Sequence, residues 1–211
     1  MIKVHYFFDP LCGWCYGIAP LIKAAAALPD VEMHLHGGCL WPRPTVLPAA
    51  VRRQIRLADA RVGQLSGQPY GQRYLDGLLP SDGMVLHSQP TTAAVLAAGA
   101  LRPGADLEML RAIQSAHYVD GAHVVEADTL RRLAQGIGLD ADAFQAMLDP
   151  AAADSHMQQS QRLMQQLGVG GFPAVFIERD GHFAELAPQG YFGDPSGFVT
   201  AIQASGRKTL H

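Results

Sequence analysis

Cys12-Gly13-Trp14-Cys15 is the most informative segment of this chain, and it follows the apolar run Val4-His5-Tyr6-Phe7-Phe8. A short run rich in aromatic residues predicts a buried strand, and the segment around and after the second cysteine predicts a helix. Two cysteines with this spacing at a helix start lie one turn apart on one face. They can close a disulfide or stay a dithiol, so the pattern is typical of a redox site.

The predicted helix start also favours reactivity at Cys12. The first turn of a helix directs unpaired N–H groups and a partial positive charge outward. This favours the thiolate over the thiol, and the thiolate is the nucleophile. The sequence therefore predicts thiol–disulfide exchange, with no bound metal or cofactor needed for the chemistry.

Composition limits the class of protein. The chain has 211 residues, 48% of them hydrophobic, so it can bury a substantial core. Its 16 Lys and Arg residues form no long basic run, which argues against nucleic-acid binding. Three cysteines are too few for a disulfide scaffold. Neither a secretory signal nor a membrane-spanning run is evident, so we expect a cytoplasmic protein with no membrane partner.

The order of predicted elements indicates an α/β fold. Strands at 2–8 and 31–36 flank a helix at 14–28, which makes a βαβ unit with parallel strands. Residues 47–149 are predicted to be helical nearly throughout. A helix, two strands and a helix follow, at 151–167, 173–178, 182–186 and 194–204. We therefore predict one domain from 1–44 and 151–211, and an all-helical insertion domain at 45–150.

Two segments resemble one family. Phe8-Asp9-Pro10-Leu11-Cys12-Gly13-Trp14-Cys15-Tyr16-Gly17 resembles the active-site segment of DsbA-like thiol–disulfide oxidoreductases, closest to the cytosolic FrnE-like branch. Residues 168–176 resemble the loop of that family that bears a cis-proline. The resemblance implies a thioredoxin-like fold (βαβ + ββα) with a helical insertion. It also implies that Cys12 attacks, that Cys15 resolves, and that Pro173 is cis and lies beside the disulfide.

The chain departs from the periplasmic DsbA proteins at two places. They usually carry Pro-His between the cysteines, where this chain has Gly13 and Trp14, and an acidic residue six positions before the first cysteine, where it has Tyr6. Reduction potentials of related folds span roughly 150 mV, and the intervening dipeptide tunes them. We therefore expect the reductase or isomerase direction rather than strong oxidation.

Five residues are predicted to bind substrate: Trp14, Gly171, Phe172, Pro173 and Tyr191. Trp14 lies between the thiols and is expected to be partly exposed, where it packs on the helix start or contacts substrate. A cis bond before Pro173 frees backbone groups that can pair with an extended substrate, and Gly171 leaves room for its approach. Tyr191 either lines the groove or closes the core. Expected substrates are disulfide- or dithiol-containing proteins, peptides or small thiols, with glutathione as a candidate co-substrate.

Asp9 and Cys39 have two interpretations each. Asp9 is expected to be a solvated turn or cap residue, or else a proton acceptor for the thiols. Cys39 is expected to be a buried small hydrophobe, with a redox role as the alternative.

Three rival functions remain open. A zinc site would need a third and fourth ligand beside the motif, such as Cys39 and a nearby histidine, but the usual paired spacing is absent. A glutathione-dependent isomerase of the same fold typically has a serine where Cys12 stands. A non-catalytic module would use the peptide groove alone.

Overall fold

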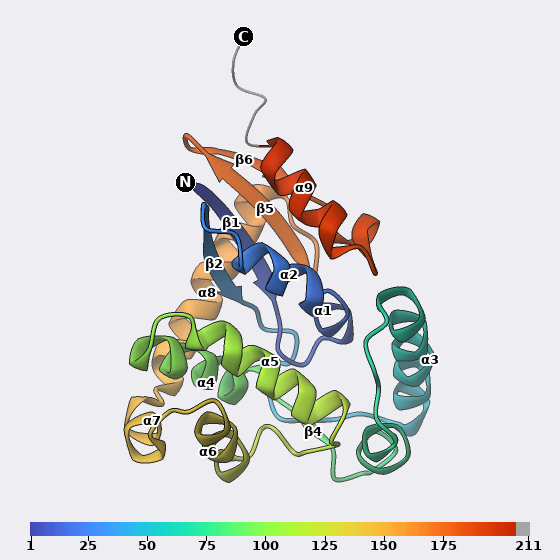
Figure 1. Ribbon diagram of the computed structural model, residues 1–211. Coiled ribbons are helices and arrows are strands. Elements are labelled where there is room, and N and C mark those ends of the chain that lie inside the picture. Colours follow the sequence, from blue (N-terminus) through green and yellow to red (C-terminus); the bar gives the residue numbers. More distant parts are fainter. Residues whose placement is uncertain (206–211) are drawn as a thin grey trace.

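A four-stranded sheet forms the centre of the upper half of the molecule in Figure 1, in a computed structural model that describes residues 1–205. Its strands are β1 (Ile2–Phe8), β2 (Val31–Gly37), β5 (Ala174–Arg179) and β6 (His182–Glu185), in the order β2-β1-β5-β6. β1 runs parallel to β2 and antiparallel to β5, and β6 is antiparallel to β5. The predicted βαβ and ββα units are therefore confirmed and share one sheet.

Helices cover both faces of this sheet. α1 (Gly13–Gly17), α2 (Ala19–Ala26) and α9 (Pro195–Ser205) lie on one side, and α8 (Pro150–Leu167) lies on the other (Figure 1). Side chains alternate along a strand, so Tyr6 and Phe8 of β1 enter the main core. Phe7 points the other way and packs with Phe176 beneath α8.

The helix predicted at 14–28 is wrong in one respect, because it is two helices broken at Ile18. Pro20 stands in the first turn of α2. Proline has no N–H to donate to the carbonyl of Tyr16, and its ring collides with that carbonyl in a continuous helix. The break leaves a short α1, which begins directly after Cys12.

The segment between β2 and α8 holds five α-helices and a π-helical turn. They are α3 (Ala49–Ser66), η1 (Arg73–Leu78), α4 (Ser88–Leu101), α5 (Ala105–Tyr118), α6 (Ala127–Gly136) and α7 (Ala141–Met147). A 3₁₀ turn, η2 (Pro188–Tyr191), precedes α9. The expectation of an all-helical insertion is corrected by β3 (Thr45–Val46) and β4 (Val85–Leu86), which pair antiparallel. Two-residue strands are too short to show alternation, so sequence patterns miss them.

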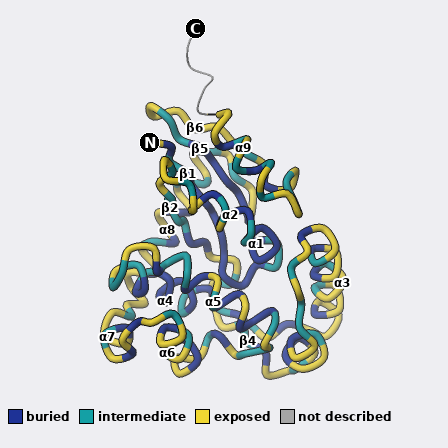
Figure 2. Tube along the Cα trace, in the orientation of Figure 1, coloured by how far each residue is buried: buried dark blue, intermediate teal, exposed yellow. Residues whose placement is uncertain are grey.

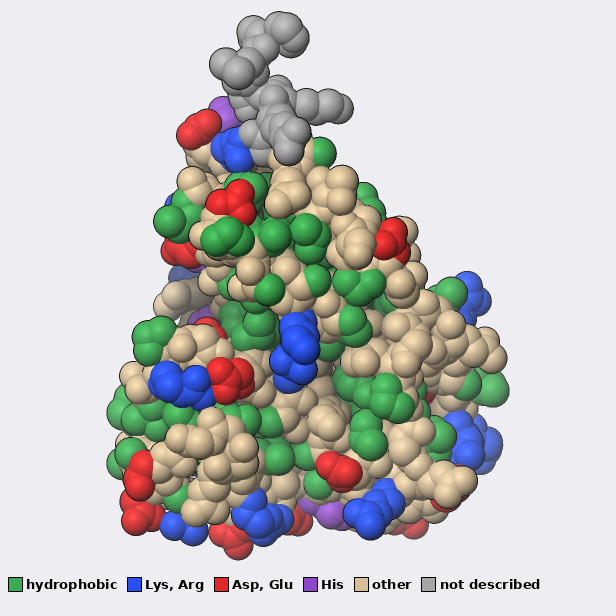
Figure 3. Space-filling view, viewed as in Figure 1, with side chains coloured by type: hydrophobic (Ala, Val, Ile, Leu, Met, Phe, Trp, Pro, Cys, Tyr) green, Lys and Arg blue, Asp and Glu red, His purple; other side chains and the backbone are tan. Residues whose placement is uncertain are grey.

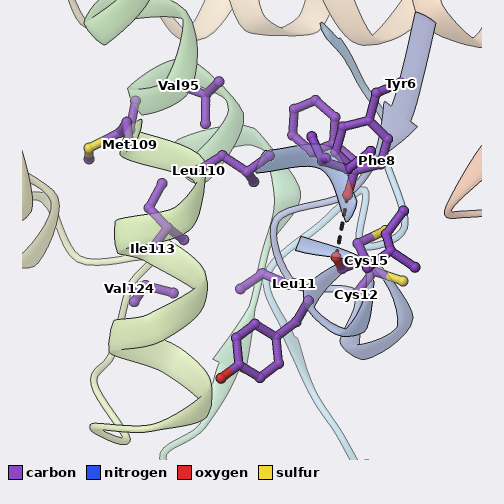
Figure 4. Close-up of a cluster of buried hydrophobic side chains, with 14 of the residues drawn as sticks. Tyr6, Phe8, Leu11, Cys12, Cys15, Val95, Met109, Leu110, Ile113 and Val124 are labelled. Atoms are coloured by element: carbon purple, nitrogen blue, oxygen red, sulfur yellow. Dashed lines mark hydrogen bonds between the residues drawn. The ribbon is translucent and has the colours of Figure 1, made fainter. Parts of the chain in front are cut away.

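The insertion and the sheet share one hydrophobic core. Val95 on α4 and Leu110 and Ile113 on α5 point toward the side where Tyr6 and Leu11 lie (Figure 4). Figure 2 shows the same continuity, since buried segments run from the strands into α4 and α5 while the outer side of α3 is exposed. The cysteine motif therefore sits where the two parts of the molecule meet.

The outer surface carries scattered charges. In the view of Figure 3, acidic and basic side chains lie singly or in small groups among apolar and neutral ones. Within residues 1–205, no helix has both the length and the apolar character needed to cross a bilayer.

Candidate active site

Cys12 and Cys15 occupy different environments at the start of α1. Cys12 is the N-cap residue of the helix and is 6% exposed, whereas Cys15 lies one turn inside and is fully buried. Both side chains are free thiols. The Tyr6 hydroxyl donates a hydrogen bond to the Cys15 carbonyl at 3.4 Å, which ties α1 to β1 (Figure 4). Only Cys12 therefore offers its sulfur to a ligand from outside.

Burial raises the pKa of the Cys15 thiol well above its ordinary value, and the adjacent Cys12 thiol adds to the rise. A thiol in an apolar environment loses the hydration that stabilises its anion. The Cys15 thiol is therefore protonated at neutral pH. This asymmetry suits a pair with one attacking and one resolving thiol.

The predicted cis bond before Pro173 is confirmed. The Cys12 thiol donates to the Phe172 carbonyl oxygen at 3.8 Å, so the loop and the motif face each other. Gly38 leaves room for the Phe172 ring beside this contact, because a Cβ at that position would overlap the ring. Cys12 and Phe172, which are 160 positions apart in the chain, therefore lie side by side.

A cavity of about 550 Å³ opens on this side of Cys12. Its lining is apolar, thioether and amide in character, without a charged side chain. The lining residues are Cys12, Gly38, Cys39, Leu40, Pro42, Met157, Gln161, Met164, Gln165, Val169, Gly170, Gly171 and Phe172. We call this cavity the groove.

Cys39 is exposed and lines the groove together with Cys12, so the expectation that it is buried is wrong. The chain leaves β2 at Gly37, and the Leu40 N–H is held by the Asp9 carboxylate at 2.8 Å. Cys39, the residue before this anchored amide, lies at the surface. Because Cys39 is far from Cys12 in the sequence, their shared cavity could not be predicted from the sequence.

A second cavity of about 180 Å³ lies between the motif and the insertion. Cys12 and Trp14 line it together with Trp41, Asp59 and Tyr118. Trp14 is half-buried, as predicted, and its ring lies 5.9 Å from that of Phe192. Cys12 thus borders two cavities, one formed with the cis-proline loop and one with the insertion.

Asp9 opens a turn, as expected, but it is fully buried, so the expectation that it is solvated is wrong. Its carboxylate accepts hydrogen bonds from Leu11 N at 2.9 Å, Leu40 N at 2.8 Å and Ser88 Oγ at 2.6 Å. Burial raises the pKa of Asp9, while these donors oppose the rise. The carboxylate therefore holds together three segments around Cys12.

The remaining predicted residues divide into two groups. Gly171 and Phe172 line the groove, and Pro173 lines an adjoining cavity of about 340 Å³ along the same loop. Tyr191 packs instead with its ring 5.5 Å from that of Phe198, a fully buried core residue, and lines neither cavity that contains Cys12.

Sequence reasoning missed Asp59. It lies on the buried side of α3, between Ile55 and Val62 at helical spacing, and is 3% exposed. The signal that points to it is an acid placed between apolar residues at helical spacing, on a face that also buries Arg52 and Ser66. Within the described residues, no group of three or more His, Cys, Asp and Glu side chains is arranged to hold a metal ion.

The fold and the paired cysteines define a thioredoxin-fold protein with a CxxC redox motif facing a cis-proline loop. The chain belongs to the DSBA-like thioredoxin domain family, whose model matches residues 3–193.

Solved structures agree with this assignment. The chain is similar to the cytosolic disulfide reductase DsbM from Pseudomonas aeruginosa, with 40% identity, 97% of this chain and 98% of the other covered, and a TM-score of 0.88. A structure of that protein with GSH matches at 39% identity over 97% and 99% of the chains, with a TM-score of 0.86. A putative protein disulfide isomerase from Nitrosomonas europaea shares the fold, at 23% identity over 100% and 99% of the chains and a TM-score of 0.83.

Among curated proteins, the chain is similar to the ClpXP adapter protein SpxH of Bacillus licheniformis, at 23% identity over 184 residues. The match covers 82% of this chain and 57% of that protein, so the chain spans little more than half of this relative's length.

Proposed function

We propose that this thiol–disulfide oxidoreductase works in the cytoplasm as a disulfide reductase, with Cys12 as attacking thiol and Cys15 as resolving thiol. One observation carries the proposal: Cys12 borders an open groove beside the Phe172 carbonyl, while Cys15 is fully buried one turn behind it. The 40% identity to a cytosolic disulfide reductase supports the direction and the compartment.

The proposed reaction moves two electrons and two protons. The Cys12 thiolate attacks one sulfur of a substrate disulfide, which forms a mixed disulfide and releases the other sulfur as a thiolate that takes up a proton. Cys15 then loses its proton and attacks the Cys12 sulfur. The second substrate sulfur leaves and is protonated, and the enzyme retains the Cys12–Cys15 disulfide.

Glutathione is the proposed reductant that restores the dithiol. Two glutathione thiols supply the two electrons and become glutathione disulfide. The determination of a related structure with GSH supports this choice. The groove has room for such a molecule, since small-ligand sites typically measure about 300–1,000 Å³.

The loop beside Cys12 is the proposed substrate platform. Gly171 is exposed and, like Gly170, has nothing within 4 Å of where a Cβ would be, so an extended backbone can lie along the loop. Phe172 and Trp14 line the two different cavities that Cys12 borders. Asp9 is proposed to position this site, because three donors already hold its carboxylate.

Cysteine replacements test the proposal. Cys12→Ser should abolish glutathione-linked reduction of a small disulfide and of insulin. Cys15→Ser should accumulate a mixed disulfide at Cys12 that mass spectrometry detects, since the resolving thiol is gone. Leu57→Ala, at a position of α3 that is 74% exposed, is the control and should retain activity. Turnover that survives loss of Cys12, or the absence of any trapped adduct, would contradict the assigned roles.

A further inference from the structure

A buried carboxylate that the exchange chemistry does not use lies against the cysteine motif. Asp59 on α3 is 3% exposed and lines the 180 Å³ cavity together with Cys12. Helix α3 packs directly on α1. A Cβ at Gly13 would overlap Asp59 Oδ1, so the acid sits over the residue that follows Cys12.

Two tyrosines hold this carboxylate in place. The Tyr74 hydroxyl donates to Asp59 Oδ2 at 2.7 Å, and the Tyr70 hydroxyl, which donates to the Gly13 carbonyl at 3.3 Å, also stabilises the carboxylate. Within the described residues, no Lys or Arg forms an ion pair with Asp59. Burial raises the pKa of Asp59 to about 6, against the opposing effect of the tyrosines. Asp59 therefore gains its charge close to neutral pH.

The other titratable side chains around this carboxylate stay neutral near pH 7. They are Tyr70 just before η1, Tyr74 on η1, and His117 and Tyr118 on α5. Burial raises the pKa of each tyrosine above its ordinary value and lowers the pKa of His117 to about 4. Asp59 and Cys12 are thus the two groups along this cavity whose negative charges can repel each other.

We propose that Asp59 sets the redox poise of the Cys12–Cys15 pair by opposing the Cys12 thiolate. Two negative charges repel more strongly in a mostly buried setting than they do in bulk water. The thiolate exists only in the reduced protein, and the disulfide carries no charge. Repulsion therefore raises the free energy of the reduced form and makes it a stronger reductant. This inference rests on the proposed function of Cys12.

The insertion gains a chemical role from this arrangement. On β1, the position under the cysteine pair is occupied by Tyr6, whose hydroxyl bonds to the Cys15 carbonyl. The acid comes instead from α3, on the opposite side of the motif. The helical segment would then tune the thiols as well as enclose them.

Asp59→Asn tests the proposal by removing the charge while keeping the shape. The readouts are the ultraviolet absorbance of the thiolate as a function of pH, with Cys12→Ser as the baseline, and the equilibrium of the dithiol with a glutathione and glutathione disulfide buffer. We expect on the order of tenfold more thiolate at about pH 7, equivalent to one pH unit, and an equilibrium shifted toward the dithiol. Asp76→Asn, which removes an exposed carboxylate from η1, is the matched control and should change neither readout.

Tyr74→Phe provides a second, independent test. It removes a donor that favours ionised Asp59, so the carboxylate stays protonated to higher pH. The thiolate fraction should rise near neutral pH and return to the wild-type value about two pH units higher, where Asp59 is ionised again. A purely structural role of Asp59 would not give this pH-limited effect.

The outcomes separate this inference from the proposed function. If Asp59→Asn and Tyr74→Phe both fold and both give the same thiolate curve and glutathione equilibrium as the wild type, the role of Asp59 is overturned. This holds even if Cys12→Ser abolishes exchange. If Asp59→Asn does not fold, the Tyr74→Phe curve decides. If Cys12→Ser and Cys15→Ser both keep their activity, the proposed function itself is overturned.

Discussion

Single glycines set how closely other parts of the molecule approach the thiols. Gly13 leaves space for the Asp59 carboxylate, and Gly38 leaves space for the Phe172 ring. Neither glycine has a positive φ, so the reason for glycine is space rather than backbone conformation. Both faces of the Cys12 site therefore depend on the absence of a Cβ.

Gly13→Ala should destabilise the protein. The new methyl group would push against Asp59 Oδ1 and displace a carboxylate that two tyrosines hold. Overpacking of this kind costs about 1–3 kcal/mol, measured as the free energy of unfolding in urea. Gly77→Ala is the control, because nothing lies within 4 Å of its added Cβ. Equal stability of the two variants would show that Asp59 yields without cost.

Helix ends determine how the long helices join the site. Asp149 caps α8 by accepting from Ala151 N at 2.9 Å and Ala152 N at 3.1 Å, and Pro150 opens the first turn. Helix α8 packs on both α4 and β2. Its cap thus fixes an element that links the insertion to the sheet.

Asp149→Ala should lower the free energy of unfolding by about 1 kcal/mol, because two amide donors lose their acceptor. Asp149→Asn should retain nearly all of the stability, since an asparagine oxygen accepts the same bonds. Thermal or urea unfolding compares the two variants. A similar loss in both would indicate that the charge, rather than the cap, stabilises the helix.

The molecule is expected to unfold as one unit, because the insertion and the sheet share one hydrophobic core. Leu110 of α5 is 1% exposed and belongs to the same cluster as Tyr6 and Cys15. No separate hydrophobic core isolates the insertion helices within the described residues. Opening the insertion would therefore expose the back of the redox site.

Leu110→Ala should cost about 2–5 kcal/mol in unfolding free energy while keeping a single cooperative transition. Tryptophan fluorescence, which reports on Trp14 and Trp41 near the motif, should coincide with far-ultraviolet circular dichroism, which reports mainly on the helices. Leu57→Ala is the control, because Leu57 is 74% exposed and should tolerate the change. Two separated transitions would show that the insertion melts on its own.

Features that depend on neighbouring residues could be predicted from the sequence. The CxxC pair at a helix start and the βαβ and ββα order follow from local spacing and local patterns. The cis bond before Pro173 followed from resemblance to a family rather than from local propensity. In each case the deciding atoms lie within a few residues in the chain or in a short motif.

The surroundings of the sulfur atoms became known only from the folded structure. Asp59 over Gly13, Cys39 in the groove and the buried Asp9 join segments that are far apart in the sequence. Periodicity shows which face of a helix or strand is buried, but it does not show which other element that face meets. The order of elements was therefore readable from the chain, while the electrostatic setting of the thiols arose only when the insertion packed against the sheet.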